Sequence, residues 1–290
     1  MYGLHAWQFP LAAAFMWAAT LTAMIITWAA KGKPVYESQD GSIPYISDIG
    51  ASFLKPLFVV GSVITGLGFF LTVLSERVYR EKGRLLSNVQ RRGAVMGVIS
   101  CICALIAAAG LSLLAGFDTL NYTTLHRLFL LIFMLGTVLS AIATTVEFLV
   151  LKREARHAAG LADTTDFTFN ITKMIQGLAG SYIAKLIIVV IEIALSIAFG
   201  ITMYKGSNEV AAVLEWMIAY IFVFFLITFY FDLRPAAGSP KGKYDVSRIV
   251  GVGSRAELGP GGRPSMSTRA SGSEQVTPEM GQVQPNVNRV

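Results

Sequence analysis

Charged side chains are scarce in this sequence of 290 residues. Asp, Glu, Lys and Arg make up 14% of it, whereas they form about a quarter of an ordinary soluble domain. Cysteine is nearly absent: Cys101 and Cys103 lie two residues apart in one apolar run and point to different faces of a helix, which excludes a disulfide framework. A Gly-x-Ser-x-Gly nucleophile elbow is also lacking. We therefore predict no catalytic residue, no metal site and no cofactor, and favour a protein that is not an enzyme.

Long apolar runs are abundant instead. Six runs of about 20 residues occur, at about 10–30, 56–75, 93–117, 128–151, 186–204 and 211–231. A helix of this length crosses the roughly 30 Å hydrocarbon core of a bilayer, and in lipid the backbone polar groups must be satisfied within the segment. The sequence therefore predicts an all-α membrane protein, with a six-transmembrane-helix bundle over residues 1–235. The first run is preceded by no basic residue, so we interpret it as a retained helix and not as a cleaved signal peptide.

The distribution of basic residues predicts the orientation of the chain. The loops after the second and fourth runs, with their flanks, hold eleven Lys and Arg, whereas the loops after the first, third and fifth hold five. Because basic loops stay in the cytoplasm, both termini are expected there. From Pro235 onward Gly, Pro, Ser, Arg and Gln dominate. Such a segment buries too little apolar surface to offset its ordering entropy, so residues 236–290 are predicted to form a disordered cytoplasmic tail.

Two acidic residues, Glu147 and Glu192, lie inside predicted spans. A carboxylate is costly in lipid and usually has a reason to be there. For Glu192, near the centre of the fifth span, we consider a proton or headgroup relay and, with more weight, a polar contact that ties two helices together. Glu147 lies near the inner end of the fourth span, where its side chain is expected to reach the interface beside Lys152.

The predicted topology gathers polar residues on the outer face. They come from the loop before the second span, the turn before the fourth and the start of the sixth: Pro44, Tyr45, Ser47, Asp48, Asp118, His126, Glu215 and Trp216. Three interpretations stay open for this cluster. Asp48 and His126 have structural roles in the first, with Asp48 capping the second span; the second is a headgroup-binding site, and the third is an acid–base or metal site. The structural interpretation has the most weight and the catalytic one the least.

Six basic residues follow the second span within a short stretch of sequence: Arg77, Arg80, Lys82, Arg84, Arg91 and Arg92. Besides setting the orientation, such a group attracts anionic lipids of the inner leaflet by about 1 kcal/mol per cation. We therefore predict that membrane lipids, including anionic phosphoinositides, are partners. Nucleic acid is not predicted as a partner, because the positive charge follows the sides of the membrane.

Three stretches resemble the Frag/DRAM/Sfk family of six-span membrane proteins. They are Pro44-Tyr45-Ile46-Ser47-Asp48-Ile49-Gly50, Phe117-Asp118-Thr119 with Leu125-His126, and Glu215-Trp216 with Phe231-Asp232-Leu233. The resemblance covers roughly residues 1–235, and the first stretch is the most specific. Ile49 and the long tail look like the fungal, Sfk-like subgroup. Many animal members have Pro-Glu after this loop, whereas this chain has Leu54-Lys55-Pro56.

The resemblance implies a function in membrane lipid biology. Sfk-like members are plasma-membrane partners of a phosphatidylinositol 4-kinase complex, which implies a lipid-kinase complex as a partner here, and they influence the distribution of phospholipids between leaflets. Other members remodel the lipid of GPI anchors in the secretory pathway or modulate autophagy at the lysosome or vacuole. The expected location is therefore the plasma membrane, with the endoplasmic reticulum, the Golgi or the vacuole as alternatives.

Overall fold

The computed structural model describes residues 5–88, 90–161, 165–237, 239–242 and 244. Their elements are α1 (Gln8–Ala30), α2 (Ile46–Gly50), α3 (Lys55–Glu81), α4 (Arg91–Gly116), α5 (Thr123–Leu161), α6 (Thr165–Tyr204), α7 (Asn208–Leu233) and a 3-10 turn (Arg234–Ala236). No β-strand occurs among these residues. All of these helices except α2 are long and apolar enough to cross a membrane, which confirms the predicted all-α fold with six spans.

Several helices extend beyond the predicted spans. α3 continues to Glu81 and not to residue 75, α5 continues to Leu161 and not to 151, and α6 begins at Thr165 and not at 186. The helices are longer than the predicted spans because an apolar run marks only the part of a helix that lies in hydrocarbon, whereas the backbone hydrogen bonds continue through the charged turns beyond it. The basic stretch at residues 152–156, expected as a loop, therefore lies within α5.

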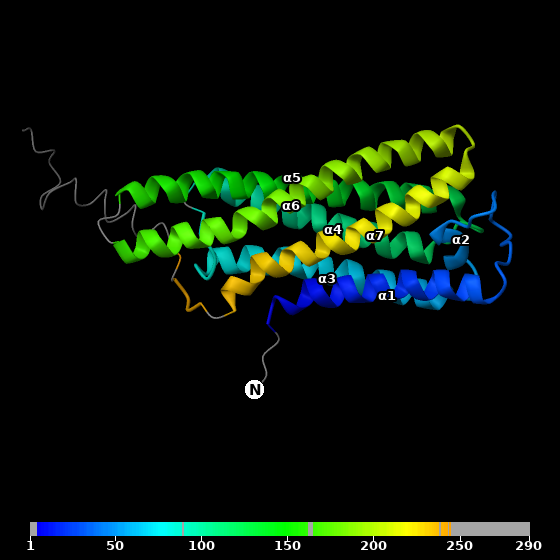
Figure 1. Cartoon of the computed structure of the whole chain (residues 1–290), viewed down its shortest axis with the longest axis horizontal. Helices are drawn as coiled ribbons and strands as arrows, with labels where there is room; N and C mark the ends of the chain where they lie inside the picture. The colour runs from blue at the N-terminus through cyan, green and yellow to red at the C-terminus, as the bar shows by residue number, and fades with distance from the viewer. Residues whose placement is uncertain (1–4, 89, 162–164, 238, 243, 245–290) are drawn as a thin grey trace, which may run out of the picture. The chain divides into compact units, whose positions relative to one another are not determined.

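The first and last spanning helices share one end of the bundle (Figure 1). The start of α1 lies near the end of α7, where the rings of Trp7 and Tyr230 are 5.8 Å apart. The short helix α2 lies at the opposite end, as does the turn between α6 and α7. We call the end with α2 the motif end, and the end where residues 82–90 join α3 to α4 the basic end. Which of the two faces the cytoplasm stays a prediction.

Small residues bring α4 close to its neighbours. A Cβ atom on Gly110 would lie 2.8 Å from the backbone nitrogen of Phe133 in α5, and one on Gly66 of α3 would lie 3.0 Å from the carbonyl oxygen of Ala108. Backbones that approach so closely gain the dispersion contacts that hold helices together in lipid, where the hydrophobic effect is absent.

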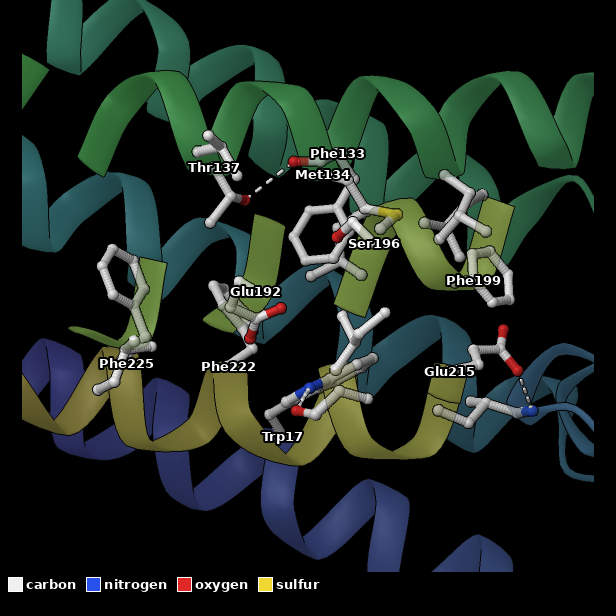
Figure 2. A pocket seen from close by; sticks show the side chains of 18 of the residues that line it. Trp17, Phe133, Met134, Thr137, Glu192, Ser196, Phe199, Glu215, Phe222 and Phe225 are labelled. Atoms are coloured by element: carbon white, nitrogen blue, oxygen red, sulfur yellow. Dashed lines mark hydrogen bonds between the residues drawn. The ribbon is translucent and has the colours of Figure 1, made fainter. Parts of the chain in front are cut away.

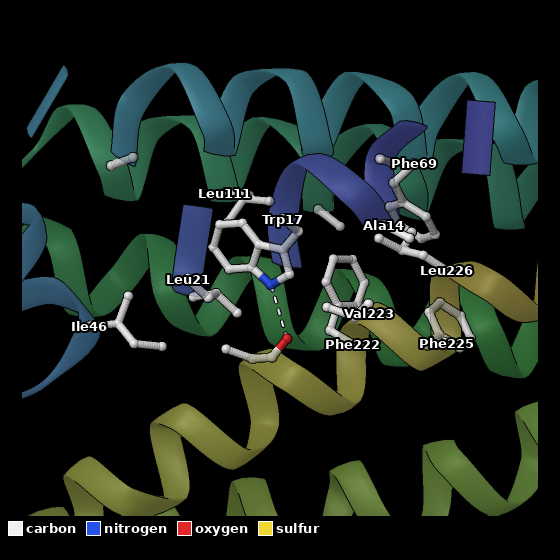
Figure 3. Close-up of a cluster of buried hydrophobic side chains, with 14 of the residues drawn as sticks. Ala14, Trp17, Leu21, Ile46, Phe69, Leu111, Phe222, Val223, Phe225 and Leu226 are labelled. Carbon is white, nitrogen blue, oxygen red and sulfur yellow. Dashed lines mark hydrogen bonds between the residues drawn. The ribbon is translucent and has the colours of Figure 1, made fainter. Parts of the chain in front are cut away.

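The core lies between α1, α3, α4 and α7, and α6 contributes few buried side chains to it. Trp17 is buried at its centre, next to Leu111 and Phe222, and its Nε1 atom donates a hydrogen bond to the carbonyl of Ala219 at 3.0 Å (Figure 3). In the most apolar part of α7 44% of the residues are buried, against 11% in α6. α6 therefore depends on a few specific contacts for its position.

Candidate functional site

The Pro44–Gly50 motif forms a short helix and not the open loop expected from its polar, turn-rich composition. Tyr45 is extended and precedes α2, and its backbone N–H donates to Oδ2 of Asp48 at 2.9 Å. Ser38 donates its hydroxyl to Oδ1 of the same carboxylate at 2.6 Å. Asp48 thus caps α2 itself and does not cap the second span, as one interpretation had it. Burial raises the pKa of Asp48, although the hydrogen bonds from Ser38 and Tyr45 partly oppose that shift.

Two residues at the start of α7 hold the motif in place. Glu215 accepts a hydrogen bond from the backbone N–H of Ile46 at 2.7 Å, and the indole of Trp216 donates to the carbonyl of Pro44 at 3.0 Å. Burial, followed by the charges of Glu215 and Asp48, raises the pKa of Tyr45 to about 12. The sequence placed these residues at one membrane level, and the structure brings them into contact. Ser47 is half-buried on α2.

Asp118 and His126 form a second group around the turn between α4 and α5. Asp118 makes an ion pair with Lys55 at 2.5 Å and accepts hydrogen bonds from Asn121. Burial acts to raise the pKa of Asp118, but the hydrogen bonds from Lys55 and Asn121 outweigh it and lower the pKa. The eight predicted residues therefore belong to two groups and not to one cluster.

His126 is buried against the last turn of α4. Its Nδ1 atom lies 2.7 Å from the carbonyl oxygen of Leu114 and 2.9 Å from that of Phe117. Carbonyl oxygens only accept, so Nδ1 carries the proton and satisfies carbonyls that a helix end otherwise leaves unpaired. This arrangement supports the structural interpretation of His126.

A buried charge network lies at the basic end. Arg80 donates to Oε1 of Glu76 at 2.5 Å and to the hydroxyl of Tyr182 at 2.7 Å, and that hydroxyl donates to Glu76 at 2.7 Å. Arg80 is only 2% exposed. The predicted contact of Arg80 with anionic lipid is therefore wrong: the side chain lies inside the protein and neutralises an internal carboxylate.

Glu147 belongs to the same network and does not reach the interface as predicted. It is buried, and its Oε1 atom accepts a hydrogen bond from Asn88 at 2.7 Å and lies 3.7 Å from Nε of Arg80 and 3.9 Å from Arg77. Gly97 makes room for it, since a Cβ atom there would lie 2.7 Å from that oxygen. Arg77 also pairs with Glu81 at 2.8 Å and is largely covered, so it is turned toward carboxylates and away from lipid.

The remaining predicted lipid contacts stay accessible. Lys82, Arg91 and Arg92 are exposed. Arg84 is half-buried, with its guanidinium 5.1 Å from the ring centre of Tyr79. The predicted lipid-contacting surface is therefore reduced to these four cations, of which three are freely presented.

The chain after α7 lies against the loop between α3 and α4. Gly242 donates its backbone N–H to Lys82 at 3.1 Å, Tyr244 donates to Gly83 at 3.1 Å, and Ser87 donates to Tyr244 at 3.2 Å. The predicted disordered tail therefore begins too early at residue 236. Residues 245–290 lie outside the described part of the chain, so the rest of that prediction stays untested.

An apolar cavity of about 70 Å³ lies between the two ends of the bundle (Figure 2). Ile46 of the motif and Phe58 contribute to its lining. Phe225 lines it toward the basic end. Its polar lining consists of Thr137, Glu192, Ser196 and Glu215. Oε1 of Glu192 is buried and has no hydrogen-bond partner among the described residues, so the predicted tie between Glu192 and a neighbouring helix is absent from them.

Several residues of these sites were not predicted from the sequence. Lys55 and Tyr182 carry no local signal of their partners, which lie 63 and 106 positions away. Glu76 and Arg80 are four residues apart, a spacing that predicts an ion pair on a helix. That pair was missed because the apolar run ends at residue 75. Among the described residues, His, Cys, Asp and Glu do not gather in groups of three able to hold a metal ion.

Six apolar helices with polar groups at both ends define a multi-pass integral membrane protein. The family described as the Frag1/DRAM/Sfk1/Cwh43P N-terminal domain matches residues 5–236, and the chain belongs to this family. The resemblance noted in the sequence is thereby confirmed.

Two fungal relatives show how far the similarity extends. The chain is 25% identical to Protein sfk1 of Schizosaccharomyces pombe over 228 residues, which cover 79% of this chain and 63% of the relative. It is 37% identical to Protein SFK1 of Saccharomyces cerevisiae over 91 residues, which cover 30% and 25% of the two chains. The matched regions are thus less than two thirds of either relative. No solved structure matches the chain.

Proposed function

We propose that this protein organises phosphoinositide signalling at the fungal plasma membrane without catalysing a reaction, as a partner of a phosphatidylinositol 4-kinase complex. Membership of the family supports the proposal, as does the similarity to two fungal Sfk proteins. Control of the phospholipid distribution between leaflets is the related function that the resemblance implies. In either case the protein acts by binding anionic lipid and presenting it at the membrane surface.

The observation that carries the proposal is the set of exposed cations at the basic end. Lys82, Arg91 and Arg92 lie where α3 ends and α4 begins, and Arg153 and Arg156 of α5 are also exposed. A surface of this kind attracts anionic lipid by about 1 kcal/mol per cation. The neighbouring Arg80 pairs with the buried Glu76, and Arg77 pairs with Glu81 and lies 3.9 Å from the buried Glu147, so neither adds to this surface.

Native mass spectrometry of the protein in nanodiscs tests this function. In discs containing phosphatidylinositol 4-phosphate, the wild type is expected to retain that lipid, whereas Lys82→Gln/Arg91→Gln/Arg92→Gln is expected to lose most of it. The matched control is Lys31→Gln/Lys33→Gln/Lys205→Gln, which removes three exposed cations from the motif end. Equal retention by the two triple variants would contradict the proposal.

Measurements in cells separate this function from the alternatives. The basic-end variant is expected to lower plasma-membrane phosphatidylinositol 4-phosphate or to expose aminophospholipids at the outer leaflet. Remodelling of GPI anchors predicts instead that the protein resides in the endoplasmic reticulum or Golgi and that Asp48→Ala alters the lipid of GPI anchors. A vacuolar location would favour the autophagy role of the family.

A further inference from the structure

The cavity between α5, α6 and α7 contains a carboxyl group that the fold leaves without a partner. Oε1 of Glu192 is buried and accepts no hydrogen bond from the described residues. The hydroxyl of Thr137, in the same lining, donates to the carbonyl of Phe133 instead. Figure 2 shows this carboxyl group within the apolar lining, between Phe222 and Ser196. A buried polar atom without a partner is costly in a low-dielectric environment, and such atoms are few in folded proteins. A donor from outside the chain would remove that cost.

The charge of the lining limits what this donor can be. The lining includes the carboxyl groups of Glu192 and Glu215, and none of the residues that form it is Lys, Arg or His. A phosphate would therefore face two acids without a counter-charge, which disfavours every phospholipid head group, including those that also carry an amine. A hydroxyl group, in contrast, donates a hydrogen bond and brings no charge.

The way into the cavity lies on the side of α5 and α6. The floor is formed by fully covered side chains such as Trp17 and Phe222, whereas Met134 of α5 and Glu192 and Ser196 of α6 are partly exposed. Both helices belong to the spanning set, so this opening faces the acyl chains of the bilayer. A volume of about 70 Å³ admits a hydroxyl group and the one or two carbons next to it, since a water-sized group takes about 30 Å³. The rest of the lipid would stay in the membrane.

The motif closes the other end of the same cavity. Ile46 contributes to the lining, and its backbone N–H is bonded to Glu215, so the hydrogen-bonding capacity of Glu215 is partly used by the protein. Glu192 is therefore the free acceptor of the pair. Glu215 therefore holds the motif in place, and Glu192 is left to bind a ligand.

We propose that this cavity binds the hydroxyl head group of a neutral membrane lipid, of the diacylglycerol class, with Glu192 accepting the hydrogen bond. The site is separate from the cations of the basic end and does not depend on the function proposed for them. The cavity would bind an uncharged lipid within the bilayer, whereas the basic end would bind charged head groups at the membrane surface.

Photo-labelling of the full-length protein in nanodiscs tests the proposal with two matched probes. One is a diacylglycerol with a diazirine in its acyl chain, and the other is the phosphatidic acid with the same chains, which differs only by a phosphate on the hydroxyl. Diacylglycerol is expected to label peptides that contain residues 130–138 and 188–199, and phosphatidic acid is expected to label them at background level. Equal labelling by both probes, or labelling confined to other peptides, would overturn the proposal.

Variants connect the labelling to Glu192. Glu192→Leu removes the acceptor and should lower labelling by diacylglycerol about fivefold, which is the contribution of a typical hydrogen bond to binding. Ser196→Phe fills the opening and should have a similar effect while leaving Glu192 in place. Glu209→Leu, which removes an exposed acid at the start of α7, should not change the labelling. Unchanged labelling in Ser196→Phe and Glu192→Leu would show that the probe reaches these peptides from the surrounding bilayer and not from the cavity, and would refute the site.

Discussion

Lys185 of α6 and Asp232 of α7 form an ion pair that solvent does not reach, with exposed fractions of 0% and 1%. The ammonium group also lies 3.5 Å from the ring centre of Phe229. Since α6 buries few of its own side chains, this pair is one of the specific contacts that hold its basic-end half against the bundle, together with the hydroxyl of Tyr182 and the hydrogen bond from Ser181 to the carbonyl of Thr228.

Removing one charge of this pair should lower the stability of the protein more than removing both charges. Asp232→Leu leaves a buried ammonium group without its partner and is expected to lower the free energy of unfolding by about 3–5 kcal/mol. Lys185→Met/Asp232→Leu removes both charges and should recover most of that loss. Thermal unfolding in detergent micelles measures the effect, with Lys173→Met, an exposed lysine of the same helix, as the neutral control. A double variant as unstable as the single one would contradict the pairing.

The hydroxyl of Tyr182 should contribute to stability independently of the packing of its ring. Tyr182→Phe keeps the stacking on Phe148, whose ring centre is 3.8 Å away, but removes the donor to Glu76 and the acceptor for Arg80. Because both partners are buried and charged, we expect a loss of about 1–3 kcal/mol in the free energy of unfolding. Tyr204→Phe, at a position 94% exposed on the same helix, should have no effect in the same assay.

Gly50 is the last residue of the motif helix α2, and only a hydrogen atom fits at its side-chain position. A Cβ atom would lie 2.5 Å from Cδ1 of Phe58, a buried ring that also lines the cavity. Gly50→Ala is therefore expected to cost about 1–3 kcal/mol of stability through overpacking. Gly200→Ala provides the contrast, since a Cβ atom there has no neighbour within 4 Å. That change should leave the melting temperature unchanged or raise it slightly, because alanine is the better helix former.

The ion pair between Asp118 and Lys55 should make stability depend on acidity. The pKa of Asp118 is lowered in the folded state, so its contribution is complete above the usual aspartate pKa of about 3.9 and is lost as pH falls through the lower, folded value. The stability difference between wild type and Asp118→Asn is thus expected at pH 7, below about 1 kcal/mol because Lys55 is partly exposed, and should shrink toward pH 3. Melting curves at the two pH values check this, with Asp40→Asn, an exposed aspartate, as the control. A difference that grows on acidification would contradict the assignment.

The orientation of the bundle has its own test. Because the basic end carries the exposed cations, it is expected in the cytoplasm together with both chain termini. A reporter fused after Val290 should then be protected in intact cells and reached by protease only after permeabilisation. A reporter accessible from outside would reverse the orientation and would remove the basic end from the inner leaflet.

Part of the candidate site was predictable from the sequence. The motif loop, the start of the sixth span and the turn before the fourth were placed at one membrane level, because six spans fix which turns share a side. The contact between Glu215 and Ile46 agrees with that expectation. The division into two groups, one around Asp48 and one around Asp118, depends on which helices are neighbours, and the order of spans along the chain does not contain that information.

Apolar length alone therefore determined that this chain is a six-span helical membrane protein, since a segment of about 20 apolar residues has only one stable arrangement in lipid. The tertiary structure decided whether each charged side chain is buried and paired or exposed. Arg80 and Arg92 are alike in sequence, yet helix packing buries Arg80 against Glu76, whereas Arg92 lies exposed at the start of α4. Glu192 shows the same dependence: its cavity is lined by side chains of α5, α6 and α7, and no local pattern in the sequence specifies how these helices pack.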